Sequence, residues 1–201
     1  MKYPAISIIE FAHIPAGIFS GDAMVKKAPV TVLQSGTVHN GKYVVLVGGS
    51  VASVEESYLE GLATGDRFVL DHLFLPDVHV QVHDAILGTR LPISSESLGI
   101  IETATLSAVV KAADKALKGT DISLVELRLA DDIGGKGLAV FSGKIEDVST
   151  AIDLARNSVI SPENWLDDKI IPRISDEILK QVERSTHFKD SKLQFLKGGE
   201  I

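Results

Sequence analysis

The chain has 201 residues, of which 45% are hydrophobic and 23% are charged, with a formal net charge of -7. This composition is ordinary for a folded protein, and the length allows one large domain or two small ones. With no cysteine, disulfides, zinc-thiolate sites and cysteine-held iron-sulfur clusters are excluded.

The charge and hydropathy patterns also bear on partners and location. The acidic balance and the absence of a Lys/Arg-rich run argue against nucleic acid. The N-terminal residues lack the pattern of an export signal, and no segment has the roughly 20 uninterrupted apolar residues of a membrane helix. We therefore expect a cytoplasmic protein that binds neither nucleic acid nor membrane.

A domain-sized segment occurs twice in the chain. After two extra residues near Asp131, Gly41-Lys42 pairs with Gly135-Lys136. The repeat predicts a first domain over 1–90, a second over 91–185 and a tail over 186–201, with a Gly/Pro/Ser-containing linker at Leu87 to Glu96. At constant spacing, the first copy's Ile8, Ile9, Glu10, Ala12, Ala16, Asp22 and Lys26 recur as Ile100, Ile101, Glu102, Ala104, Ala108, Asp114 and Lys118.

Each copy predicts the same order of elements from its periodicity. Buried first strands are expected over Ile6–Phe11 and Leu98–Thr103, and helices over Ile14–Lys27 and Leu106–Lys118. Second strands follow over Val30–Val38 and Ile122–Ala130, and third strands over Tyr43–Gly49 and Gly137–Gly143. Further helices at Val51–Leu62 and Ile145–Ala155 precede last strands at Val69–Pro76 and Lys169–Pro172. Each copy is thus α+β, with one sheet and two main helices.

The segment GTVHNGKY, from Gly36 to Tyr43, is a near match to the phosphate-binding pattern G-x-x-x-x-G-K-[ST]. A phosphate loop needs a helix after it, whose N-terminus faces the anion, whereas Lys42 precedes an apolar β-branched run typical of a strand. A nucleotide-dependent enzyme is therefore the least favoured hypothesis. We expect a hairpin turn in which Asn40 and Gly41 adopt positive φ.

Several segments together resemble one known family. They are SLGIIETA at Ser97, AADKALK at Ala112, GGK at Gly134, VFSGKIEDV at Val140 and IPR at Ile171. This pattern resembles the bacterial microcompartment (BMC) shell domain, and two copies resemble the tandem shell proteins, in particular the non-permuted, single-layer type of propanediol-utilisation compartments. The resemblance implies ferredoxin-like domains, each an antiparallel sheet covered by helices, and a structural shell protein without catalytic residues.

The same resemblance implies a homotrimer, a flat pseudohexamer that tiles the shell beside other shell proteins and passes small metabolites through a central pore. Its pore-lining positions correspond here to His39, Asn40, Gly41, Ile133, Gly134 and Gly135. Its tile-edge positions correspond to Lys26, Lys118 and Arg173. No cofactor is expected, since the iron-sulfur cluster of some tandem relatives needs a cysteine where this chain has His39.

Other polar residues raise alternatives. Three converging His39 side chains could bind a metal or ligand, which would make the protein a redox module of the shell, although a solvated pore lining is favoured. Asp131-Asp132 is interpreted as a solvated loop that forms an acidic rim. His79 and His83 have metal-compatible spacing if the segment is a helix, but VHVQV also fits a strand or a short amphipathic turn, and no third ligand is evident. His79 corresponds to a family position next to the tile edge, so we interpret it as structural. Pro162 and Trp165 are expected in a loop.

Overall fold

A computed structural model describes residues 3–93 and 97–193. Its first half contains the following elements: β1 (Ala5–Phe11), α1 (Ile14–Lys27), β2 (Thr31–Val38), β3 (Lys42–Gly49), α2 (Val51–Gly65), β4 (Val69–Leu75) and α3 (Val80–Ile86). The second half contains β5 (Ser97–Thr103), α4 (Leu106–Gly119), β6 (Ser123–Leu129), β7 (Gly137–Gly143), α5 (Ile145–Ser158), β8 (Trp165–Ile171) and α6 (Asp176–Arg184). Short 3-10 turns η1 to η4 lie at His39–Gly41, Asp66–Phe68, Pro162–Asn164 and Phe188–Asp190.

The strands form two four-stranded sheets with the same order, β2-β3-β1-β4 and β6-β7-β5-β8. Every pairing between neighbouring strands is antiparallel. The α+β class and the duplicated architecture are therefore confirmed. Each half has the order strand, helix, strand, strand, helix, strand that defines a ferredoxin-like unit.

Some boundaries differ from those expected. Trp165 is not in a loop but begins β8, because it pairs with Thr103 of β5 and so extends the ladder four residues before Lys169. The helix α6 was not predicted, since its apolar residues are few and charged residues surround them. The predicted tail is described as far as residue 193, and the rest of it lies outside the described residues, as do residues 94–96 of the predicted linker.

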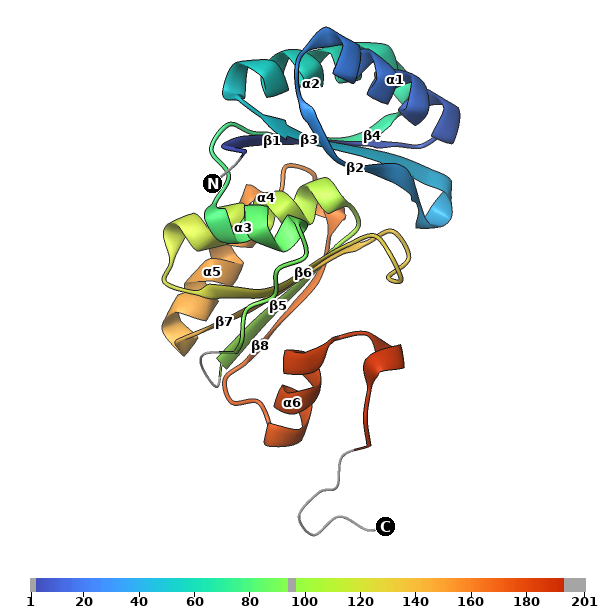
Figure 1. The fold of residues 1–201 in the computed structure, drawn as a ribbon. Coiled ribbons are helices and arrows are strands. Elements are labelled where there is room, and N and C mark those ends of the chain that lie inside the picture. The colour runs from blue at the N-terminus through green and yellow to red at the C-terminus, as the bar shows by residue number, and fades with distance from the viewer. Residues whose placement is uncertain (1–2, 94–96, 194–201) are drawn as a thin grey trace.

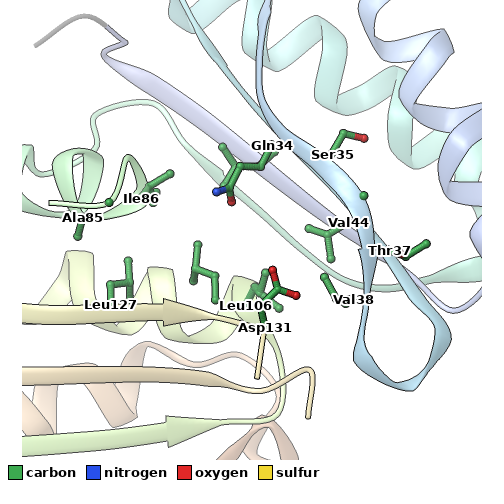
Figure 2. Close-up of a pocket in the computed structure, with 14 residues that line it drawn as sticks. Gln34, Ser35, Thr37, Val38, Val44, Ala85, Ile86, Leu106, Leu127 and Asp131 are labelled. Carbon is green, nitrogen blue, oxygen red and sulfur yellow. The ribbon is translucent and has the colours of Figure 1, made fainter. Parts of the chain in front are cut away.

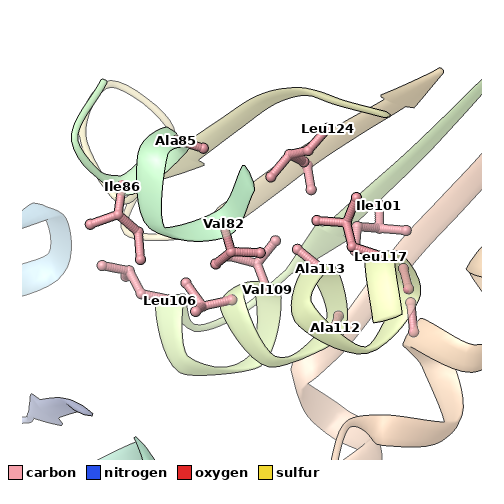
Figure 3. Close-up of a cluster of buried hydrophobic side chains, with 14 of the residues drawn as sticks. Val82, Ala85, Ile86, Ile101, Leu106, Val109, Ala112, Ala113, Leu117 and Leu124 are labelled. Atoms are coloured by element: carbon pink, nitrogen blue, oxygen red, sulfur yellow. The ribbon is translucent and has the colours of Figure 1, made fainter. Parts of the chain in front are cut away.

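The two halves share one apolar core. In Figure 1, α1 and α2 cover the far face of the first sheet, while α3 and α4 lie between the two sheets. Ile6 and Ile8 of β1 belong to the same buried cluster as Val109 and Val110 of α4. Figure 3 shows the part of this cluster where Val82 and Ile86 of α3 point toward α4. The second domain thus supplies a helix that completes the core of the first.

Within residues 3–93 and 97–193, no helix combines the length and the apolar character needed to span a bilayer.

Candidate functional site

The turn after β2 is a hairpin turn of the predicted kind. Asn40 and Gly41 have φ values of 65° and 70°, as a type I′ turn requires. Lys42 then begins β3, and its ammonium donates a hydrogen bond to the carbonyl of Ala104 at 3.3 Å. No helix follows this turn, so the geometry of a phosphate loop is absent from GTVHNGKY.

The turn after β6 contacts this first turn. The side-chain amide of Asn40 donates to the carbonyl of Gly134 at 3.0 Å. Gly135 has a φ of 79°, and a Cβ there would lie 3.0 Å from the carbonyl oxygen of His39, so the close approach requires glycine. The structure therefore gathers His39, Asn40, Gly134 and Gly135 at one place, with Gly41 and Ile133 beside them in the same two turns.

A cavity of about 490 Å³ extends from these turns along the junction of the two domains. Figure 2 shows Gln34, Val38 and Val44 of the first sheet on one side, and Ile86, Leu106, Leu127 and Asp131 on the other. The lining combines apolar side chains from both domains with the polar side chains of Gln34 and Asp131.

A buried carboxyl group lies at the junction. Glu10 is fully buried, and its Oε1 accepts a hydrogen bond from the backbone N–H of Ser107, in the first turn of α4, at 2.8 Å. Burial raises its pKa to about 7, while this N–H and the charge of Lys42 act in the opposite direction. Glu10 thus joins β1 of the first domain to a helix of the second.

Besides Glu10, two aspartates link the domains. The Oδ2 of Asp71 accepts hydrogen bonds from the hydroxyl of Thr105 and from the side-chain amide of Asn164, the latter at 3.0 Å. Asp114 is buried on α4, and its Oδ1 accepts the backbone N–H of His79 at 2.7 Å. Charged acceptors of this kind fix orientation as well as contributing energy.

The three expected edge residues have different surroundings. Lys118 forms an ion pair with Asp114 at 2.7 Å and donates to the carbonyl of Asp77, so it lies at the domain junction. Lys26 pairs with Asp22, and both side chains are exposed, at 75% and 59%. Arg173 is exposed in the segment after β8.

The two histidines near the first domain's end have structural contacts. His79 caps α3, its ring nitrogen accepting the backbone N–H of Gln81 at 3.3 Å. His83 is buried, and its Nδ1 lies 2.9 Å from an Asp84 carboxylate oxygen. In the described part of a single chain, no three His, Asp or Glu side chains gather as metal ligands would.

Sequence reasoning did not identify the junction residues Glu10, Asp71, Thr105 and Asp114 as a functional set. One signal was present, because Glu10 interrupts the apolar run ISIIEF, and a charged residue in a buried strand needs a partner. The partners could not be found, since they lie on the other repeat.

Comparison with known proteins agrees with this architecture. The BMC domain family model matches residues 5–78 and 97–174. The bacterial microcompartment shell protein PduT of Citrobacter freundii is 34% identical over 89% of this chain and 97% of its own length. The carboxysome assembly protein CcmO of Synechocystis sp. is 24% identical over 92% of this chain and 67% of its own. A solved microcompartment protein from Desulfitobacterium hafniense superposes with a TM-score of 0.77, at 34% identity, over 88% of this chain and 98% of that one.

Proposed function

This chain belongs to the BMC domain family of bacterial microcompartment shell proteins, and from that premise we propose that it forms a closed ring of three copies. The ring tiles the shell and surrounds a central pore. Members of the family are structural, and the chain is a shell component, not an enzyme. The number three is what the resemblance to tandem shell proteins implies.

One observation carries the proposal: surfaces that are buried inside the chain have exposed counterparts in the other repeat. Val110 of α4 is fully buried against the first domain, whereas its counterpart Ile18 on α1 is 54% exposed. On α3, Val82 is fully buried, and its counterpart Ile178 on α6 is 54% exposed. Exposed apolar residues at matched positions are typical of a surface that another molecule covers.

Two further pairs of corresponding positions show the same difference in exposure. Leu117 is 6% exposed and its counterpart Val25 is 44% exposed, while Leu124 is 1% exposed and its counterpart Val32 is 42% exposed. The exposed members lie on elements that would meet if the second domain of one copy packed on the first domain of the next as the two domains pack within a chain. When one head-to-tail interface is repeated and the rotation between copies is a third of a full turn, three copies form a closed ring.

Repetition of the contact between the two turns around the axis of the ring would also form a pore. Within a chain the turns at His39–Gly41 and Ile133–Gly135 touch, through Asn40 and Gly134. A ring would repeat that neighbourhood around its axis, so that His39, Asn40, Gly41, Ile133, Gly134 and Gly135 line the opening. Mostly small side chains there would expose backbone polar groups to passing small metabolites.

The variant Ile18→Lys tests the ring. We expect the wild-type chain to sediment as a trimer and Ile18→Lys to sediment as a folded monomer, because the new charge would be buried only in the ring. The matched control is Leu59→Lys on α2, where Leu59 is 57% exposed and the repeat has the exposed Asp153 at the corresponding position. A monomeric wild type, or a trimer that tolerates Ile18→Lys, would refute the proposal.

A further inference from the structure

The junction inside the chain indicates which polar contacts the junction between copies would contain, and this inference rests on the proposed ring. The contact of the Lys42 ammonium with the Ala104 carbonyl has its counterpart in Lys136 and the Ala12 carbonyl. The contact of Asp114 with the His79 N–H has its counterpart in Asp22 and the Ser175 N–H. The same kinds of donor and acceptor are therefore present at both junctions, the one within the chain and the proposed one between copies.

Two other hydrogen bonds of the junction within the chain have no equivalent in the proposed junction between copies. Ser107 donates its N–H to Glu10, but its counterpart is Pro15, which has no N–H to offer to Glu102. Asn40 donates to the second turn, but its counterpart Gly134 has no side chain. The junction between copies therefore lacks two of the hydrogen bonds that hold the domains together within a chain.

A third position is changed to a titratable group. Thr105, which donates its hydroxyl to Asp71, has His13 as its counterpart, and Asp71 has Asp167. The register agrees, because Asp71 lies opposite Glu10 in the first sheet and Asp167 lies opposite Glu102 in the second. We propose that the imidazole of His13 in one copy binds the carboxylate of Asp167 in the next, and that this pair makes closure of the ring depend on pH.

Both side chains are placed for such a contact. His13 is exposed at the N-cap of α1 without a side-chain capping bond, and its ring packs edge-on against Phe68, with centroids 5.0 Å apart. The side chain of Asp167 is 60% exposed. It accepts from the Lys169 ammonium at 2.6 Å and from the Asp168 N–H at 2.9 Å, both at Oδ1. Oδ2 is the oxygen through which Asp71 binds Thr105.

The direction of the pH effect follows from these charges. The hydrogen bond from Lys169 lowers the pKa of Asp167, so its carboxylate stays ionised well below neutral pH. Histidine gains its charge as pH falls through about 6.5, and a charged donor strengthens the bond to a carboxylate. Arg67, in the same chain as His13, lies over the Phe68 ring against which His13 packs. Across the interface, the charged groups near Asp167 are Glu102 with Lys136, Asp168 with Arg156, and Lys169.

The test measures trimer dissociation by sedimentation at pH 6.0 and pH 8.0 at equal ionic strength, for wild type, His13→Thr, Asp167→Asn and the double variant. His13→Thr restores the hydroxyl donor of Thr105 without a titratable group, and it removes the ring that packs on Phe68 at both pH values alike. We expect each of the three interfaces of the wild-type trimer to be about tenfold tighter at the lower pH, the scale of one charged hydrogen bond. Either single variant should remove most of this response, and the double variant should add nothing further.

Because the chain has no cysteine, geometry can be tested separately with His13→Cys combined with Asp167→Cys. Oxidation should give covalently closed trimers, while each single cysteine variant should not exceed a dimer. A chain that is monomeric at both pH values would refute the ring and this contact together. A stable trimer whose pH response survives in His13→Thr, and which does not cross-link as a trimer, would refute this contact alone.

Discussion

At the scale of single residues, Glu10 makes stability depend on pH. Burial raises the pKa of Glu10 to about 7, above its ordinary value of 4.5, so between these values the folded chain holds a proton that the unfolded chain has lost. The stabilising contribution of this protonation is fully present below pH 4.5 and is lost as pH rises through about 7. The shift corresponds to a change on the order of 3 kcal/mol in the free energy of unfolding.

The variant Glu10→Gln removes the titration and keeps an oxygen that accepts from Ser107. Compared with wild type in urea unfolding, it should be more stable at pH 8 by about 1–3 kcal/mol, with the difference closing near pH 5. The control is Glu55→Gln, an exposed position on α2. Parallel stability curves for wild type and Glu10→Gln from pH 5 to 8 would contradict the assignment.

At the scale of elements, each domain packs its first helix closely on its third strand, and the glycine that allows this contact lies on the helix in one domain and on the strand in the other. In the first domain the helix supplies the small residue, because a Cβ on Gly17 of α1 would lie 2.6 Å from the Cβ of Tyr43 on β3. In the second domain the strand supplies it, because a Cβ on Gly137 of β7 would lie 2.6 Å from the Cβ of Val109 on α4. The helix therefore approaches its sheet closely in both domains, with large and small residues exchanged.

The variant Gly137→Ala should overpack this contact and lower the free energy of unfolding by about 1–3 kcal/mol, since the branched Val109 side chain cannot turn away. Adding Val109→Ala should recover part of that loss, so that the two effects do not add. Gly36→Ala is the control, because a Cβ at Gly36 would have no neighbour within 4 Å. Thermal or urea unfolding of wild type, Gly137→Ala, Val109→Ala and the double variant measures the coupling, with Gly36→Ala as the fifth chain.

Much of this element-scale organisation could be predicted. The repeat and its hydrophobic periods predicted the strand order along the chain and the Asn40-Gly41 turn, because these depend on local preferences. The helix α6 was missed although Leu179 and Val182 have helical spacing, because the segment is short and most of its residues are polar or charged. The Glu10 to Ser107 contact was also missed, because an alignment of the repeats shows which positions correspond but not which ones touch.

At the scale of the whole molecule, each domain has one junction formed within the chain and, in the proposed ring, a second junction with a neighbouring copy. The linker holds the first junction at a high effective concentration, so it can form without a neighbour. In the proposed ring, the second junction, which involves α1 and α6, depends on protein concentration and on His13. The tandem chain is therefore expected to assemble in two steps, with domains joining first and copies second.

A role of Lys26 at the outer edge of the proposed ring can be tested through the packing of tiles into sheets. Its pair with Asp22 is exposed, and such pairs contribute at most about 1 kcal/mol, so Lys26→Ala should leave the unfolding temperature almost unchanged. Because its counterpart Lys118 donates to the Asp77 carbonyl at the domain junction, Lys26→Ala should weaken the proposed trimer, so the sheets are compared at concentrations where the trimer is intact. If Lys26 lies at a tile edge, the same variant should reduce the extended sheets of tiles visible by electron microscopy.

Lys118→Ala should instead lower the free energy of unfolding by about 1–3 kcal/mol, because it leaves the Asp114 carboxylate, 7% exposed, without its cation. Lys115→Ala, an exposed position on the same helix as Lys118, serves as the control for both, and sheets as extensive in Lys26→Ala as in wild type would exclude the edge role.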